Sequence, residues 1–347
     1  MKNNNNFRII RLIAAIMVIT GHMFVLIGCA PPIMMWNSIH SLGVAFFCVI
    51  GGYLITLGWL RRPDFKQYLV KRIFRIFPAL IACVLFVIFM IGPLVTELSI
   101  KEYFSNSLTW RYLLNCVLYI NYVLPGVFEN NIYGSAVNGS LWFLPVQFLM
   151  YLLIPVYVGI GNRISVKAQK TYYIITTLFV IAFRCIWTTW FDDTLFVFYG
   201  MSFSQIMRYC IPYYFVGCLF AVCKLENILN LQIAVVAIIG SAMCSFLPAF
   251  FSHCLESILI PYVVLSLALT EKPVFATAAK IDISYGMFLF SFIIQQTLIQ
   301  IFILRDWDLN VWLLIILSVF ISLIMGTLTE RFIEQPSRKI CKKIVKE

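Results

Sequence analysis

Runs of about 20 apolar residues, each long enough to cross a ~30 Å hydrocarbon layer as a helix, recur along the whole chain. Of the 347 residues, 62% are hydrophobic and 12% are charged, and the charged share is about half of that in an ordinary soluble protein. This composition excludes a water-soluble globular enzyme. It predicts an all-α polytopic membrane protein in which residues 1–347 form a single integral-membrane domain.

About ten spans are predicted, at roughly 9–29, 40–60, 77–96, 141–161, 171–190, 205–223, 229–249, 254–270, 283–304 and 311–330. If the N-terminus is inside, 20 of the 26 lysines and arginines fall in cytoplasmic segments and three in outer segments. Lys and Arg concentrate in cytoplasmic loops. Both termini are therefore predicted to be cytoplasmic, and the net charge of +11 reflects orientation in a lipid bilayer, with no nucleic-acid partner.

The segment at residues 112–126 is apolar but short, and Asn115, Asn121 and Pro125 interrupt it. We predict that it is re-entrant or interfacial and does not span the membrane. If it did span, the basic loop at residues 162–170 would lie outside, against the distribution of the other positive charges.

The eleven cysteines are scattered singly and show no Cys-x-x-Cys spacing. They predict neither a metal site nor a disulfide framework, and we interpret them as small packing residues.

Two ionisable residues, Arg11 and His22, lie inside the first apolar run. Charge within a membrane is costly, which makes both residues functional candidates and makes this run an uncleaved span, since a signal core does not carry them. Their spacing places them about 20° apart around a helix and about 16.5 Å apart along it. The pair suits one elongated ligand with an anionic head at Arg11 and a reactive end at His22.

Burial disfavours the imidazolium form, so His22 is expected to be neutral and able to accept a proton. If Arg11 and His22 are considered separately, each has another possible role. Arg11 could be an anchor that reaches back to the interface, and His22 could be a hydrogen-bonded core histidine.

Several stretches occur in a characteristic order: FRIIRLIAAIMVITGHMF (7–24), GVAFFCVIGGYLIT (43–56), KRIFRIFP (71–78), LPGVFENNIYGSAVNGSLWFLPVQFLMYLLIP (124–155), ISYGMFLF (283–290) and ERFIEQP (330–336). Together they resemble the integral-membrane acyltransferase family 3, whose hallmark is an Arg, ten residues and a His. The resemblance covers nearly the whole chain. Residues 124–155, which include the expected outer segment and the span after it, are similar to the same region of family members that O-acetylate polysaccharides.

The resemblance implies transfer of an acyl group, most often from cytoplasmic acetyl-CoA, to a hydroxyl of a polysaccharide or lipid-linked glycan at a bacterial cell membrane. His22 would act as general base. Arg11 with Lys71, Arg72 and Arg75 would bind the CoA phosphates, because Arg offers forked donors to phosphate. The same basic cluster also fits simple cytoplasmic topology. Direct transfer is favoured over an acyl-enzyme, because no activated nucleophile is recognisable.

The acceptor side is expected to include Glu129, Asn138, Ser140, Trp142, Gln147, Ser284 and Tyr285. Trp142 could stack on a sugar or belong to the aromatic belt at the interface. The family usually has Glu where this chain has Gln147, and often His where it has Ser291. Gln147 can orient a group by hydrogen bonds but cannot act as a base.

Other intramembrane features receive simpler interpretations. Arg184 is expected to line the cavity or to snorkel, His253 and Glu256 to form a structural pair, and Gly51-Gly52 to mark close helix packing. Two alternative functions stay open: a transporter of a small anionic substrate, and an inactive family member. The sequence shows no internal duplication of the kind found in inverted-repeat transporters.

Overall fold

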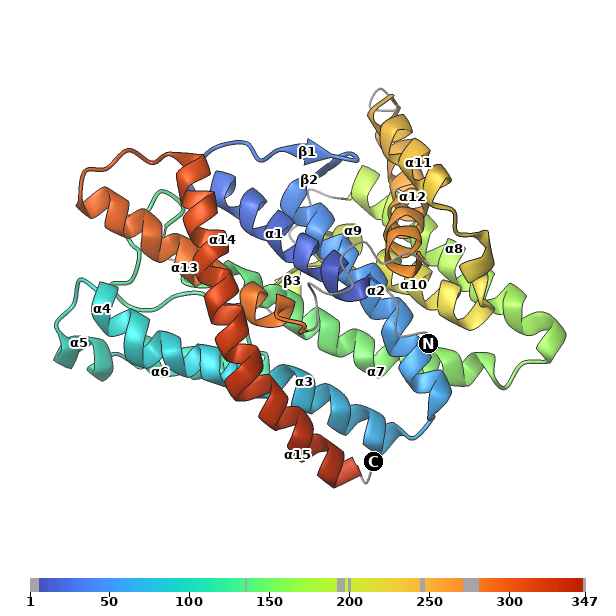
Figure 1. The fold of residues 1–347 in the computed structure, drawn as a ribbon, viewed down its shortest axis with the longest axis horizontal. Coiled ribbons are helices and arrows are strands. Elements are labelled where there is room, and N and C mark those ends of the chain that lie inside the picture. The colour runs from blue at the N-terminus through green and yellow to red at the C-terminus, as the bar shows by residue number, and fades with distance from the viewer. Residues whose placement is uncertain are drawn as a thin grey trace. The chain divides into compact units, whose positions relative to one another are not determined.

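The computed structural model is built almost entirely of helices (Figure 1). It describes residues 6–134, 136–191, 197–198, 201–243, 247–270 and 281–345. Within these residues, nine helical segments are long and apolar enough to cross a membrane. Their main helices are α1 (Phe7–Leu26), α2 (Ile39–Arg61), α3 (Phe65–Phe86), α7 (Phe143–Gly161), α8 (Val166–Trp190), α10 (Ile211–Cys223), α12 (Ala249–Leu269), α13 (Ser284–Leu304) and α14 (Val311–Thr329).

Shorter elements extend or connect these helices. A π-helix at Val87–Ile91 and α4 (Gly92–Val95) prolong α3, and a π-helix at Glu330–Glu334 joins α14 to α15 (Gln335–Val345). The remaining elements are α5 (Ile100–Ser105), α6 (Ser107–Arg111), α9 (Phe203–Tyr209), α11 (Leu231–Met243), 3₁₀ turns at Tyr112–Val117, Gly139–Trp142 and Leu225–Ile228, and two antiparallel pairs, β1 (Ile33–Met34) with β2 (Asn37–Ser38) and β3 (Val197–Phe198) with β4 (Met201–Ser202).

The chain forms two compact units. The first contains residues 1–14, 33–69 and 146–280, and the second contains residues 15–32, 70–145 and 281–347. Three of the boundaries fall within α1, α3 and α7, so each of these helices contributes to both units.

Nine of the ten predicted spans correspond to long apolar helices of the described residues, which confirms the all-α polytopic class. The span predicted at 229–249 corresponds to α11, which has 13 residues and is therefore only about 20 Å long. The cytoplasmic location of both termini stays a prediction. It needs an even number of crossings and so depends on α11 also crossing.

The structure corrects the predicted start of the third span. The helix begins at Phe65 and not near residue 77, so Lys71, Arg72 and Arg75 are helical residues and not loop residues. Lys and Arg have high helix propensity, and charge opposes burial in hydrocarbon without opposing helix formation.

The segment at residues 112–126 contains no long helix, in agreement with its predicted failure to span. Asn115 explains where the helical turns end. Its side-chain amide donates to the carbonyls of Tyr112 and Asn121, each at 2.9 Å, and its oxygen accepts the Asn121 N–H at 3.0 Å. These bonds replace the helical ladder beyond Val117. The location of this segment at the interface or within the bilayer stays a prediction.

Arg184 of α8 is completely buried in the first unit, and so it does not snorkel. Its guanidinium forms an ion pair with Glu256 and donates to the Ser257 hydroxyl at 2.6 Å and the His253 carbonyl at 2.5 Å. The predicted partner of Glu256, His253, lies with its Nδ1 at 3.5 Å from the same carboxylate. The main contact of Glu256 is therefore with α8, and it joins α8 to α12.

Close packing of α2 against α10 depends on Gly52, as the Gly51-Gly52 pair predicted. A Cβ placed on Gly52 would lie 2.1 Å from the backbone oxygen of Tyr214. Backbone cannot move aside as a side-chain tip can, so any larger residue separates the two helices.

We predict that Gly52→Ala lowers the melting temperature of the purified protein, because α2 and α10 must separate to admit the methyl group. Gly159→Ala on α7 is the matched control, since a Cβ at Gly159 meets nothing within 4 Å. Thermal unfolding of both variants in the same detergent tests this. Equal melting temperatures for the two would contradict the packing argument.

Candidate functional site

His22 is held against α13 in the second unit. The Gln295 amide, fully buried on α13, donates to the Ile19 carbonyl of α1 at 2.7 Å, one turn before His22. The His22 ring is half-buried and meets the Phe292 ring edge to face, with centroids 5.5 Å apart and planes at 78°. Met23 and Leu26 pack in the same apolar cluster as Phe292. The histidine is therefore fixed by contacts on both sides along the helix.

The polar segment that contains Asn131 and Asn138, which the sequence predicts to be on the outer side, is hydrogen-bonded along the same helix α13. Asn131 donates to the backbone and side-chain oxygens of Gln296, each at 2.9 Å, and the Gln296 amide donates to the carbonyls of Gly134 and Ala136. Further along, Asn138 donates to the Leu289 carbonyl at 2.9 Å. Asn131, Gly134, Ala136 and Asn138 thus lie along two turns of α13.

The turn formed by Asn138, Gly139 and Ser140 contacts the same phenylalanine as His22. A Cβ on Gly139 would lie 2.7 Å from the Phe292 ring, so the absence of a side chain lets this ring lie against the turn. Ser140 is buried, and its hydroxyl has no hydrogen-bond partner among the described residues. The structure therefore places a histidine and a polar turn on one aromatic ring.

Tyr122 belongs to the same outer segment, and its carbonyl accepts the Val137 N–H at 2.7 Å. Burial raises the pKa of Tyr122 to about 12, with a smaller effect from Tyr133. The phenol therefore stays protonated at neutral pH and remains a hydrogen-bond donor.

Three other expected acceptor-side residues lie in different surroundings. Glu129 is exposed, and its carboxylate accepts the Gly126 N–H at 3.0 Å, which stabilises a turn. Trp142 is half-buried and contacts Phe143 edge to face. Gln147 is half-buried on the part of α7 that belongs to the first unit.

The basic cluster of α3 is organised by carboxylates that the sequence interpretation did not include. Arg75 forms ion pairs with Glu334 and, at 3.2 Å, with Asp282. Its guanidinium also lies over the Tyr285 ring, 5.5 Å from the centroid. Tyr285 donates to the Ile76 carbonyl at 2.8 Å. Arg75 therefore links α3 to α13 and to the end of α14.

Ser284 and Tyr285 therefore lie beside the ion pairs of Arg75 and not at the turn formed by residues 138–140. The Ser284 hydroxyl donates to Asp282 at 2.6 Å, and Asp282 in turn pairs with Arg75. This placement follows from their position at the first turn of α13, whereas Leu289 and Phe292 lie further along the helix. The acceptor-side role expected for these two residues stays a prediction.

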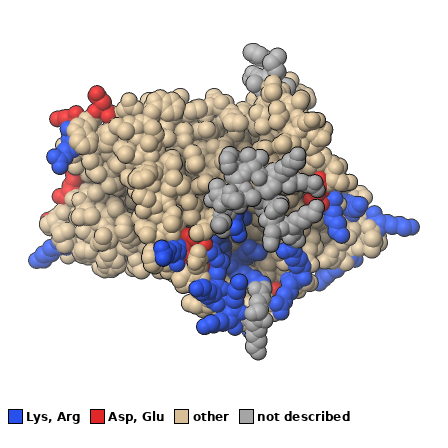
Figure 2. Space-filling model, viewed as in Figure 1, with Lys and Arg blue, Asp and Glu red and all other residues tan. Residues whose placement is uncertain are grey.

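The C-terminal motif ERFIEQP supplies the rest of this network. Arg338 of α15 pairs with Glu330 and lies 3.5 Å from Glu334, both of which are buried, and Ser337 donates to the Phe74 carbonyl at 2.8 Å. Figure 2 shows Lys and Arg side chains gathered on the surface over α3 and α15. Lys71 and Arg72 are half-buried on α3 beside this network, and Lys339, Lys342 and Lys343 are exposed on α15.

Arg11 lies on α1 in the first unit and is half-buried. The observed helix from Phe7 to Leu26 is continuous through both residues. The spacing argument for Arg11 and His22 on one helical face therefore applies to the helix as it is.

Comparison with known proteins identifies the family of this chain. The profile of the family described as an acyltransferase domain matches residues 4–331. The chain belongs to the acyltransferase family 3. An O-acetyl transferase of Shigella phage Sf6 is 26% identical over 98% of this chain and 99% of the phage protein. Nodulation protein 10 of Rhizobium leguminosarum bv. viciae is 25% identical over 97% of this chain and 94% of its own length. No solved structure matches.

Family membership confirms the predicted resemblance and makes the protein an acyltransferase. The match spans both compact units, since it runs from residue 4 to residue 331. It does not assign roles to individual residues. The roles of His22, Arg11, Lys71, Arg72 and the polar turn stay predictions.

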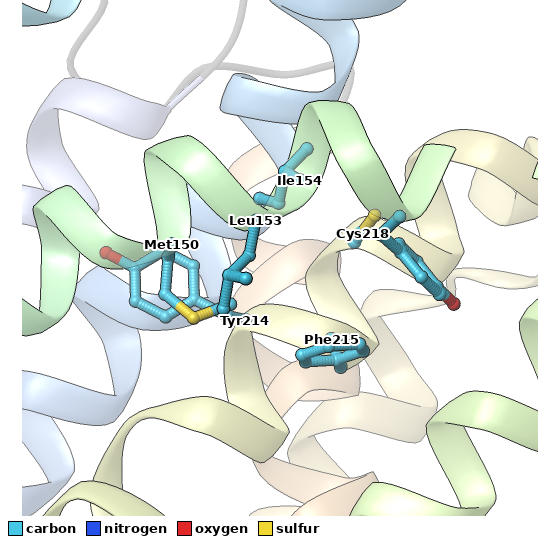
Figure 3. Close-up of a pocket in the computed structure, with 7 residues that line it drawn as sticks. Met150, Leu153, Ile154, Tyr214, Phe215 and Cys218 are labelled. Atoms are coloured by element: carbon cyan, nitrogen blue, oxygen red, sulfur yellow. The ribbon is translucent and has the colours of Figure 1, made fainter. Parts of the chain in front are cut away.

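The acyltransferase also has a small apolar hollow of about 10 Å³ between α7 and α10 in the first unit (Figure 3). Met150, Leu153 and Phe215 are among its lining residues, and none of the lining side chains is charged. A hollow of this kind does not suit the phosphates of a CoA donor.

The sequence did not reveal the other members of the charged network around Arg75, which are Asp282, Glu330, Glu334 and Arg338. The available signal was the pair of acidic residues at 330 and 334 in an otherwise basic C-terminal segment. Such residues at a membrane boundary are paired in most cases. Phe292 carried no signal, because an aromatic residue in an apolar span is ordinary core.

We predict that Arg75→Met destabilises the acyltransferase by about 3 kcal/mol, because the buried carboxylate of Glu334 then loses the nearer of its two arginine partners. Adding Glu334→Leu should restore part of the loss, since the uncompensated charge is gone. Thermal unfolding in detergent measures both effects, and Arg331→Met, at an exposed arginine nearby, is the control. A single variant as stable as the parent protein would show that the pair is not structural.

Proposed function

We propose that this acyltransferase moves an acetyl group from cytoplasmic acetyl-CoA to a hydroxyl of a carbohydrate, either a cell-surface polysaccharide or its lipid-linked precursor, in a bacterial cell membrane. Support for the acetyl group comes from the full-length similarity to a phage protein named O-acetyl transferase. Support for the membrane location comes from the nine long apolar helical segments among the described residues.

The observation that carries the proposal is the placement of His22. A histidine inside an apolar helix shares the Phe292 ring with the turn at Asn138–Ser140. A general base has to lie close to the hydroxyl that it deprotonates. The polar turn offers amide and hydroxyl groups of the kind that bind sugar hydroxyls.

In the proposed reaction, His22 takes the proton of the acceptor hydroxyl as its oxygen attacks the thioester carbonyl. The carbon–sulfur bond breaks, and the CoA sulfur leaves with the proton that the imidazolium returns. The hydroxyl of Ser140 is hydrogen-bonded to no base among the described residues. This supports direct transfer over an acyl-serine intermediate, which would need an activated hydroxyl.

The anionic part of the donor is assigned to Arg11, Lys71 and Arg72. Arg75 is less suited, because Asp282 and Glu334 already compensate its charge. The two ion pairs of Arg75 reduce the attraction that its guanidinium can exert on a phosphate.

We predict that His22→Ala and His22→Gln reduce acetyl transfer by at least about 100-fold, the usual contribution of a general base. Purified protein, radiolabelled acetyl-CoA and a panel of bacterial glycans measure this. His40→Ala is the matched control, because His40 is also a half-buried histidine near the end of a long helix.

Unchanged label transfer by both His22 variants would remove the assigned base. A parent protein that transfers no label to any glycan, yet binds acetyl-CoA, would indicate an inactive family member. Flux of a small anionic substrate without acyl transfer would indicate a transporter.

We predict that Arg72→Ala raises KM for acetyl-CoA about 10-fold, the value of one charge-assisted hydrogen bond, and leaves kcat nearly unchanged. With acetyl-pantetheine, which lacks the nucleotide phosphates, the variant and the parent should have equal KM values. Lys101→Ala, at an exposed lysine of α5, is the control. An equal KM increase with both donors would mean that Arg72 does not bind phosphate.

The acceptor can be identified by mass spectrometry of surface polysaccharide from cells with and without the gene. An acetyl ester adds ~42 Da for each modified repeat unit, as a covalent ester requires. Polysaccharide of unchanged mass would exclude this acceptor while leaving the donor reaction open.

A further inference from the structure

Two cysteines from different helices of the first unit meet at their sulfur atoms. The Sγ atoms of Cys185 on α8 and Cys254 on α12 lie 3.3 Å apart, and both thiols are free. The sequence interpretation treated each cysteine as a packing residue. Two thiols in contact form a different kind of site, because a small change of side-chain torsions brings the sulfur atoms to bonding distance.

The buried ion pair beside them keeps the two sulfur atoms in register. Arg184, the neighbour of Cys185, bonds to His253, Glu256 and Ser257, which lie on either side of Cys254 in the sequence. The two backbones therefore cannot slide apart without breaking a buried charge pair, which is costly. This holds the thiols at a high effective concentration toward each other.

The two thiols differ in exposure. Cys185 is fully buried, whereas Cys254 is partly exposed, so a reagent in solution reaches Cys254 first.

Cys185 lies in the last two turns of α8, and Cys254 lies in the second turn of α12. Because α8 follows the basic segment at 162–170, the distribution of positive charge predicts that these helix ends face the outer side. Disulfides form and persist on that side of a bacterial membrane.

We propose that Cys185 and Cys254 form a redox modification site that takes a disulfide-bearing oxidant. The Cys254 thiolate attacks one sulfur of the oxidant's disulfide, and the other sulfur leaves as a thiol. The Cys185 thiolate then attacks Sγ of Cys254, and the second sulfur of the oxidant leaves. The two cysteines lose two electrons and two protons, and the oxidant becomes a dithiol or two thiols. The product is a covalent link between α8 and α12.

The chain contains a second cysteine pair that serves as an internal control. The thiols of Cys48 and Cys210 lie close enough to interact, but both residues are fully buried. If contact alone sufficed, both pairs would oxidise. If the exposed Cys254 is the entry point, only the Cys185–Cys254 pair will react.

The test treats the purified full-length protein in detergent with oxidised glutathione, then alkylates it in denaturant and analyses the peptides by mass spectrometry. We expect a cross-linked peptide joining Cys185 to Cys254, two hydrogen masses lighter than its reduced parts, while Cys48 and Cys210 are alkylated. Cys185→Ser should stop the reaction at a mixed disulfide of glutathione with Cys254. Cys254→Ser should leave Cys185 alkylated.

Three outcomes would overturn the proposal. In the parent protein these are a stable mixed disulfide at Cys254 without the cross-link, full alkylation of both cysteines after oxidant treatment, or equal oxidation of the Cys48–Cys210 pair. The melting temperature of each serine variant, measured before oxidation, establishes that loss of the cross-link is not loss of folding. The readout does not depend on acetyl transfer, so it stands apart from the proposed function.

Discussion

A polar side chain inside a spanning helix has to find its hydrogen-bond partner within the protein, because hydrocarbon offers none. In the second unit α13 supplies several such partners. Gln295 bonds to the backbone of α1, and Gln296 and Asn131 bond to each other and to the outer segment. Asn138 bonds to the α13 backbone. These contacts set the positions of His22 and of the polar turn, and so the arrangement of the candidate site follows from the cost of unpaired polar groups in an apolar medium.

Charge compensation governs the other end of α13 in the same way. Arg75 and Arg338 lie among Asp282, Glu330 and Glu334. The carboxylates that match Arg75 come from far away in the sequence, whereas those that match Arg338 lie in the two turns before it. A positive charge on this surface therefore does not by itself indicate a phosphate site. Arg75 is such a case, because its guanidinium holds helices together through its carboxylate partners.

The sequence was sufficient for features that depend on local pattern. Apolar runs located nine long helices of the described residues, and the spacing of Arg11 and His22 placed them on one face of α1. It was insufficient where two distant segments meet. Arg184 and Glu256 are 72 positions apart, and Arg75 and Glu334 are 259 apart, so no periodicity relates them. The early start of α3 was missed for another reason. A hydropathy pattern shows only the apolar part of a helix, and the first turns of α3 carry basic residues that continue the helix without being apolar.

Under the proposed reaction, donor and acceptor are recognised by different elements of the chain. A donor whose phosphates stay near Arg11 and whose thioester reaches His22 has to extend along α1, over about 16.5 Å of helix. Because α1 is continuous, the distance between the two residues is fixed, and so is the length of a donor that can reach both. The acceptor side consists of an irregular segment whose contacts to α13 are made by backbone groups and amides, and such segments accept substitutions and insertions more readily than helices. Specificity for the sugar can therefore change in the outer segment while the donor geometry on α1 is kept.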